Sequence, residues 1–173
     1  MSITMPGVNA VLPPRELREY RYHALDARID VNTGMPEIEQ IFHDNEDISR
    51  EVNWEDTITK TVTGRVDAYS TRNEETLSAS PFYCRKGEPV AAMLQWFDGQ
   101  ELEGDAIKRW YYEAKVDEDG FTLYAFKKLA IVKVTSVGGP ATEADQVNFD
   151  LILAGAKIEQ DFDLATGEFS DVT

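Results

Sequence analysis

Cysteine and histidine are nearly absent from this chain, which holds only Cys84, His23 and His43. A single cysteine excludes a disulfide framework within the chain, and 173 residues can bury about 70% of their unfolded surface without one. No local signature joins Cys84 to a histidine as nucleophile and base. Cys84, within SPFYC, is interpreted as a half-buried small hydrophobic residue, and His43 as a solvated loop residue.

Long apolar runs and basic residues are also scarce. No segment approaches the ~18 apolar residues of a membrane helix, and the N-terminus lacks the basic segment and apolar core of a secretion signal. We therefore expect a protein kept in a cytoplasm-like compartment. Seventeen Lys and Arg against 32 Asp and Glu give a formal charge of −15, which disfavours binding to nucleic-acid phosphates and to anionic membranes.

Motifs that carry chemistry are missing too. The stretch DEDG at 117–120 resembles part of a calcium loop, but the further oxygen ligands and the terminal Glu are absent, and a hairpin turn explains it. GGP at 138–140 is not a phosphate loop, and no carboxylate pair stands out for glycoside cleavage. We predict a protein that is not an enzyme, with no catalytic residues, cofactor or metal.

What the chain does have is β-strand patterning. About seven segments are strand candidates: 16–31, 57–70, 77–84, 108–116, 121–137, 147–153 and 158–164. One helix is expected at about residues 88–98, where Pro89 follows Glu88 and Val90, Met93, Leu94 and Phe97 form an apolar stripe. The pattern predicts a mainly β fold, an antiparallel two-sheet β-sandwich or barrel with one flanking α-helix. A single domain is expected over residues 14–173.

Two segments fit no regular element. Residues 1–13 contain Pro6 and Pro13, with Pro14 directly after them, and show no periodicity, so we expect an extended N-terminal arm. Residues 32–56 are acidic and rich in turn signals, which predicts a long loop. A connection of that length in a compact domain usually has a function, such as a lid or a binding loop.

A row of carboxylates occupies the last strand candidate. Glu159, Asp161 and Asp163 alternate with apolar residues. A half-buried strand with a solvated outer face explains the row fully. The other interpretation is a face that lines something, and the pattern alone leaves both open.

The order of features resembles a known family. KGEPVAAMLQWF (86–97) is followed by an aromatic strand, an acidic hairpin and then FKKLAIVKVTSVGGPATEADQVNFDLILAGAKIEQDFDLATGEF (126–169). This succession resembles the major tail tube proteins of long, non-contractile-tailed bacteriophages, whose fold is shared with the type VI secretion tube protein. The resemblance covers roughly the last half of the chain by motif and the rest by order.

The resemblance implies a β-sandwich that assembles into rings of six, which stack into a hollow tube for DNA passage. The implied partners are further copies of the chain and the tape-measure, distal-tail and tail-terminator proteins, with no membrane. DNA would pass without specific binding. The implied location is the virion tail, after assembly in the bacterial host cytoplasm.

Site residues are implied as well. The arm and the long loop correspond to segments that bridge subunits and rings, with Glu46, Asp47 and Trp54 as candidate inter-ring residues. An acidic lumen would repel phosphates. Glu159, Asp161 and Asp163 are the preferred lumen-lining candidates, and the Thr/Arg/Asp face of 57–69 is the second.

A different class of function stays open beside this one. The chain could be a monomeric acidic β-sandwich that binds carbohydrate or protein, or that mimics DNA. Trp54, Trp96 and Tyr111 would then form an exposed aromatic platform. A subunit of a tube should form concentration-dependent oligomers, whereas a binding module should remain monomeric.

Overall fold

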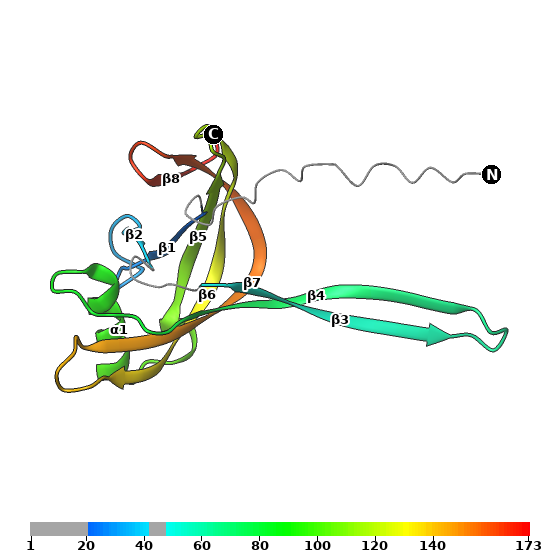
Figure 1. The fold of residues 1–173 in the computed structure, drawn as a ribbon, viewed down its shortest axis with the longest axis horizontal. Coiled ribbons are helices and arrows are strands. Elements are labelled where there is room, and N and C mark those ends of the chain that lie inside the picture. The colour runs from blue at the N-terminus through cyan, green and yellow to red at the C-terminus, as the bar shows by residue number, and fades with distance from the viewer. Residues whose placement is uncertain (1–20, 42–47) are drawn as a thin grey trace, which may run out of the picture.

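A computed structural model describes residues 21–41 and 48–173 (Figure 1). The elements are β1 (Arg21–Asp26), β2 (Ile38–Gln40), β3 (Arg50–Lys60), β4 (Val66–Ala79), α1 (Pro89–Gly99), the 3₁₀ turn η2 (Gly104–Ile107), β5 (Lys108–Val116), β6 (Thr122–Gly138), β7 (Gln146–Asp163) and β8 (Glu168–Asp171). The strands pair antiparallel in the order β2-β1-β5-β6-β7-β4-β3, and β8 pairs with the end of β7. The predicted mainly β, antiparallel fold with one α-helix is confirmed.

The main core lies between α1 and one face of the sheet. Pro89 opens the helix, and the four predicted stripe residues are each at most 3% exposed. They pack against buried side chains of several strands, among them Leu25, Leu77, Tyr111, Val132 and Leu151. The helix therefore forms where the apolar stripe predicts it, and burial of that stripe stabilises both the helix and the sheet beneath it.

The second face of the sheet is covered by the end of β7 together with β8. Strand β7 carries a register irregularity between Ala154 and Ile158, and Gly155 there has a φ of 80°. Such a bulge bends a strand. Beyond it, Phe162 and Phe169 pack against a smaller core on β1, β5 and β6. The strands thus form one hydrogen-bonded sheet with two covered faces, and the predicted segments 147–153 and 158–164 are halves of one bent strand.

Two predictions of local structure were wrong. Residues 57–70 are not a single strand, because the chain reverses between β3 and β4 at residues 61–65, where Gly64 has a φ of 83°. The β-branched residues on either side of Gly64 hid this turn. The predicted loop over 32–56 is partly strand, since it contains β2 and the first seven residues of β3. Residues 1–20 and 42–47, and with them the predicted arm, lie outside the described part of the chain.

The remaining strand predictions agree closely with the structure. Strand β5 has the predicted bounds, and β6 begins and ends within one residue of the predicted 121–137. The DEDG stretch is the turn between them, in which the Asp117 carboxylate accepts hydrogen bonds from the backbone N–H groups of Asp119 and Phe121. Segment 77–84 is only the end of β4 followed by a single bridge from Tyr83 to Gln146.

Candidate assembly surface at the projecting hairpin

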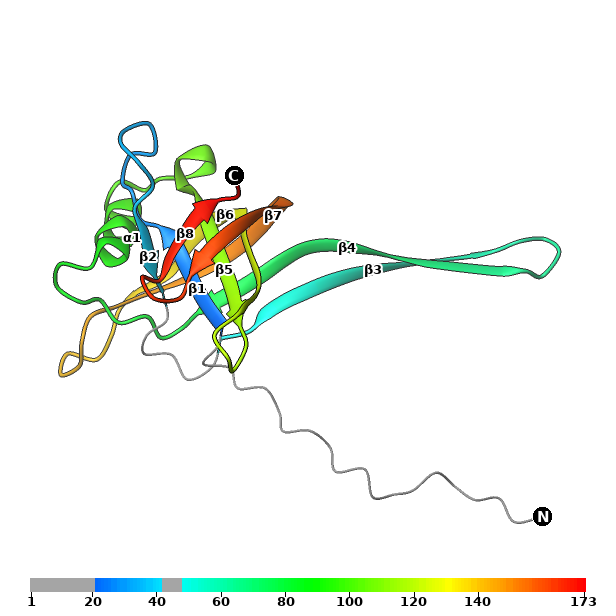
Figure 2. The same cartoon turned by 90° about the horizontal axis from the view of Figure 1, so that it is seen from above.

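A long β-hairpin projects from the body of the protein. In both views β3 and β4 extend far beyond the rest of the sheet (Figures 1 and 2). Strand β4 pairs with β7 only from Glu75 to Ala79, and the remainder of β4 pairs with β3 alone. We call residues 53–74 the projecting hairpin. All of them are exposed except Thr57, which is half-buried.

The projecting hairpin has two chemically different faces. Cross-strand pairing places Trp54 opposite Arg72, Ile58 opposite Ala68, and Lys60 opposite Val66. These residues share what we call the apolar face, on which Trp54, Ile58 and Val66 are 57%, 70% and 59% exposed. The other, hydroxyl-rich face carries Glu55, Thr57, Thr59, Asp67, Tyr69 and Thr71.

Cross-strand contacts on the apolar face stabilise the hairpin only locally. The Arg72 guanidinium lies 5.2 Å from the centre of the Trp54 ring, and the Ser70 hydroxyl donates a hydrogen bond to the Asp56 carboxylate. Such exposed contacts contribute about 0.2–1 kcal/mol each. A two-stranded hairpin is at best marginally stable in water without a further strand or a covering layer. Exposed apolar side chains on a ribbon that the described residues leave uncovered therefore make the hairpin a candidate contact surface.

A buried group of charges lies where the hairpin leaves the body. Arg50, the first residue of β3, is bound to Glu75 of β4 through Nη1 at 2.6 Å and to Glu113 of β5 through Nε at 2.8 Å. The side chains of Glu75 and Glu113 are 3% and 0% exposed. We call these three residues the root cluster. It joins β3 to a strand that is not its neighbour in the sheet.

Neighbouring polar groups complete the root cluster. Glu113 accepts hydrogen bonds from the hydroxyl groups of Tyr111 and Tyr124, at 3.0 and 2.8 Å. The Tyr111 oxygen lies 2.6 Å from His23 Nδ1, so a Tyr111 hydroxyl that donates to Glu113 receives its own hydrogen bond from a protonated Nδ1. Lys128 Nζ lies 3.6 Å from the second Glu75 oxygen. The two buried carboxylates are thus compensated, as buried charges must be.

The pKa directions agree with this geometry. Burial acts to raise the pKa of Glu75, but the hydrogen bond and charge of Arg50 outweigh it, and the pKa lies below its ordinary value. Burial opposes ionisation of Glu113 as well, yet the Arg50 charge and the Tyr124 hydrogen bond lower the pKa overall. Burial and the charge of Glu113 together raise the pKa of Tyr124 to about 12. Both carboxylates are therefore ionised at neutral pH.

The sequence did not single out the root cluster. The alternation in β5 placed Glu113 opposite Tyr112 and Ala114, and that side would ordinarily face solvent. The sheet is covered on both faces here, so Glu113 and Arg109 are buried, at 0% and 2% exposed. The signal that could have revealed this is Tyr111, a large aromatic residue in the middle of the supposedly polar side and fully buried in the structure.

The predicted carboxylate row lies on β7. Glu159, Asp161 and Asp163 are exposed, whereas the intervening Gln160 and Phe162 are buried. The Asp163 carboxylate also accepts a hydrogen bond from the Ala165 backbone N–H and so shapes the turn to β8. The row has the geometry of a half-buried strand with a solvated outer face, and its lumen-lining role stays a prediction.

The predicted inter-ring residues fall in two places. Trp54 lies on strand β3 within the projecting hairpin, not in a loop. Glu46 and Asp47 lie outside the described residues, as does His43. Of the proposed aromatic platform, Tyr111 is buried in the core, while Trp54 and Trp96 are exposed on separate elements. The structure therefore does not assemble the three aromatic residues into one surface.

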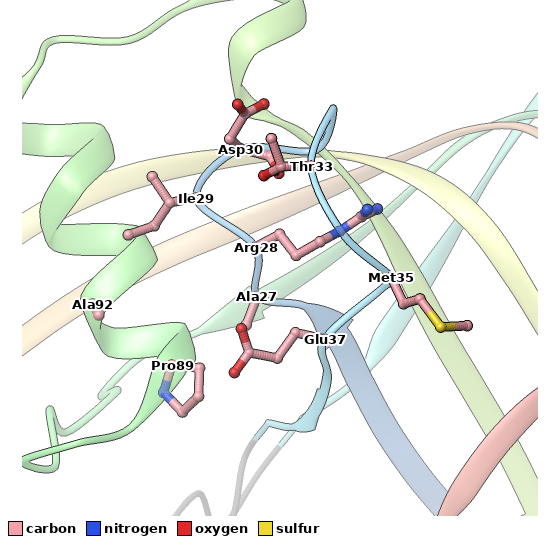
Figure 3. Close-up of a pocket in the computed structure, with 9 residues that line it drawn as sticks. All are labelled: Ala27, Arg28, Ile29, Asp30, Thr33, Met35, Glu37, Pro89 and Ala92. Atoms are coloured by element: carbon pink, nitrogen blue, oxygen red, sulfur yellow. The ribbon is translucent and has the colours of Figure 1, made fainter.

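Elsewhere the described residues offer little for catalysis. Cys84 is half-buried, and burial raises the pKa of its thiol. Figure 3 shows a hollow between the β1–β2 loop and the start of α1, where Arg28 is held by Asp26 and by the carbonyls of Val31 and Gly34. Residues 21–41 and 48–173 contain no group of three metal-ligating side chains placed to hold an ion. Within these ranges, no helix has the length and apolar character needed to cross a membrane.

Comparisons with known proteins give distant similarities of fold. No family model matches the chain, and no curated protein matches it. One solved structure with a similar fold is a chain of the anti-feeding prophage baseplate, determined by cryo-EM with six-fold symmetry. It has 8% identity and a TM-score of 0.45, over 83% of this chain and 95% of that one.

A second similar structure is a type six secretion system protein. It has 13% identity and a TM-score of 0.38, over 87% of this chain and 98% of that one. Similarity this distant leaves the family and function of the present chain unassigned, so the functional argument rests on the hairpin itself.

Proposed function

We propose that this chain is a structural subunit that assembles with copies of itself into the rings of a phage tail tube. The observation that carries the proposal is the projecting hairpin, whose apolar face and strand edges are left uncovered by residues 21–41 and 48–173. Contact with another subunit would bury Trp54, Ile58 and Val66 on that face, and strand pairing along the hairpin would remove its exposed edges. The order of sequence features that resembles tail tube proteins supports the same assignment.

A head-to-tail contact between identical subunits explains why the chain has a projecting hairpin whose apolar face is exposed. The hairpin of each copy would lie on the body of the next, and such contacts form a closed ring when the rotation between neighbours closes. Six subunits per ring and axial stacking of rings are the arrangement that the resemblance implies. The tape-measure, distal-tail and tail-terminator proteins would be the further partners in the virion.

Charge is consistent with a tube through which DNA passes without being held. The chain has a formal charge of −15, and carboxylates repel phosphates. We propose that the exposed row of Glu159, Asp161 and Asp163 lines the lumen. The predicted Thr/Arg/Asp face of 57–69, which carries Asp67 and Arg65 on the hydroxyl-rich side of the hairpin, is the second candidate.

The decisive experiment measures assembly of the purified chain. Sedimentation velocity over a range of concentrations should show growing oligomers, and negative-stain electron microscopy should show rings or hollow filaments. Ile58→Asp places a charge on the apolar face and should abolish assembly. Thr59→Asp adds the same charge one residue away, at an exposed position on the hydroxyl-rich face, and should leave assembly largely intact.

Two results would contradict the proposal. A wild-type chain that stays monomeric at high concentration favours the monomeric binding module instead. Equal assembly of the Ile58→Asp and wild-type chains would remove the apolar face from the subunit contact.

A further inference from the structure

The root cluster is placed where it can control the direction of the hairpin. Arg50 begins β3, and Glu75 is the residue at which β4 leaves its pairing with β7. Beyond this point the two strands pair only with one another, so no further ladder fixes their direction relative to the body. A register irregularity between Val52 and Trp54 also interrupts the β3–β4 ladder just outside the root cluster.

Arg50 links its own strand β3 to the neighbouring β4 and to β5, which is distant in the sheet order. Its Nη1 is bound to Glu75 of β4, and its Nε and Nη2 lie 2.8 and 3.5 Å from the two oxygens of Glu113 on β5. Strand β5 is separated from β3 in the sheet by β6, β7 and β4. The planar guanidinium, with donors in fixed directions, therefore ties the base of the hairpin to the far side of the curved sheet.

We propose that the root cluster is a strut that sets the direction of the projecting hairpin, and that neutralising its carboxylates frees the hairpin to move. The body keeps its apolar cores when the strut is lost, because α1 and β8 cover the sheet without it. The consequence for ring assembly rests on the proposed function: a hairpin without a fixed direction would dock on its neighbour more weakly, since docking must then fix that direction at an entropic cost.

The charged and titratable groups around the strut come from every strand packed on it. They are His23 on β1, Tyr111 on β5, Tyr124 and Lys128 on β6, and Lys157 together with the carboxylate Glu159 on β7. The Lys157 ammonium lies 4.1 Å from the centre of the Phe126 ring, on which the Arg50 guanidinium also lies, at 5.6 Å. The surroundings are therefore net basic once both carboxylates are neutral, which favours separation of Arg50 from the body.

The pH window follows from the direction of the carboxylate pKa values. Glu75 and Glu113 both have a pKa below the ordinary 4.5. A lowered folded-state pKa means that the stabilisation is complete above about pH 4.5 and is lost as the pH falls through the folded value. The hairpin should keep its direction at neutral pH and lose it only in acid below pH 4.5.

The test measures the direction of the hairpin in the single chain. Two spin labels are attached in a Cys84→Ala background, at Thr63→Cys on the hairpin tip and at Asp98→Cys on α1. Pulsed electron paramagnetic resonance then measures the distribution of the distance between them. Every chain in the sample also carries Ile58→Asp, so that the hairpin stays undocked, and labelled protein is diluted with unlabelled chain, so distances between subunits do not contribute. Arg50→Gln is compared with Arg72→Gln, which removes the same charge from the same hairpin without touching the body.

The strut predicts a narrow distance distribution in the parent chain and in Arg72→Gln, and a distribution about twice as wide or wider in Arg50→Gln. Glu75→Gln/Glu113→Gln should be equally broad at pH 7 and should not broaden further at pH 4. Circular dichroism and amide protection in β5–β6 check that each variant keeps its body. If Arg50→Gln does not fold, Glu75→Gln alone is judged by the same criterion.

Equal widths in Arg50→Gln and the parent chain, or equal broadening in Arg72→Gln, would overturn the strut. This result is separate from the assembly experiment, because it concerns the undocked hairpin. A strut without ring formation would leave the inference intact while the proposed function fails. If the wild-type chain forms rings but Arg50→Gln leaves the hairpin direction unchanged, the proposed function stands and the strut fails.

Discussion

The helix-covered core and the projecting hairpin use similar side chains in opposite environments. Leu151 and Val90 are fully buried in the core, whereas Ile58 and Val66 on the hairpin are 70% and 59% exposed. Residue type therefore does not decide burial here; the number of layers over each strand does. The core is covered by other elements of the same chain, whereas the described residues leave the apolar face of the hairpin uncovered. The comparison teaches that the monomer is complete in its body and incomplete in its projection.

The largest expected effect comes from comparing two arginines, Arg50 in the root cluster and Arg72 on the projecting hairpin. Arg50→Met should lower the free energy of unfolding by about 3–5 kcal/mol, because it leaves two buried carboxylates without their main partner. Arg72→Met should cost about 1 kcal/mol or less, because its contact with Trp54 is exposed. Urea denaturation of both variants in parallel measures the difference. Equal losses of stability in the two variants would show that the buried carboxylates of the root cluster do not depend on Arg50.

A pair of apolar truncations sharpens the same contrast. Leu151→Ala removes a fully buried side chain from the core and should cost about 2–5 kcal/mol through lost burial and the cavity left behind. Ile58→Ala should change the stability of the monomer by less than about 0.5 kcal/mol. Ile58→Ala should instead weaken assembly, measured as a higher protein concentration for half-maximal oligomer. A large loss of monomer stability in Ile58→Ala would mean that the hairpin packs on its own body in solution.

Acid should lower the stability of the protein through the root cluster. Below about pH 4.5, protonation of Glu75 and Glu113 removes stabilisation that is fully present at neutral pH, because both folded-state pKa values are lowered. Urea midpoints measured from pH 7 to pH 3.5 should fall in this range. The Glu75→Gln/Glu113→Gln variant should begin less stable and show a shallower fall. Identical pH profiles in the variant and the parent would assign acid sensitivity to other carboxylates.

Much of the body could be predicted because each of its elements follows a periodic pattern of apolar residues that is visible in the local sequence. The stripe of α1 and the alternation of β5 predict the bounds of both elements to within one residue, although β5 is buried on both sides. The hairpin was harder, because Thr61 and Thr63 continue the β-branched pattern through the turn and only Gly64 interrupts it. The sequence also did not predict the bend of β7 at Gly155. An interruption between two apolar runs is consistent with two separate strands and with one bent strand.

The candidate site was less predictable than the fold. Arg50, Glu75 and Glu113 are separated by 25 and 38 residues in the sequence, and only the curvature of the sheet brings them together. No local periodicity records such a contact. Trp54 was singled out for its exposure, which is correct, but its place on a strand depends on the turn that the pattern concealed. Contacts between distant strands are the information that a single sequence carries least.

The smallest expected effect distinguishes the hairpin turn from a glycine in the body. Gly64 has a φ of 83°, where a side chain costs roughly 1–2 kcal/mol, so Gly64→Ala should destabilise the turn. Gly99 ends α1 without a positive φ and with open space around it, so Gly99→Ala should be close to neutral. We expect the projecting hairpin to open independently of the body, so Gly64→Ala should speed hydrogen exchange about ten-fold at amides of residues 57–70. Exchange in β5 and β6 should stay unchanged. If Gly64→Ala instead lowered the global free energy of unfolding by the full 1–2 kcal/mol, hairpin and body would unfold as one cooperative unit, and the contrast between a complete body and an incomplete projection would fail.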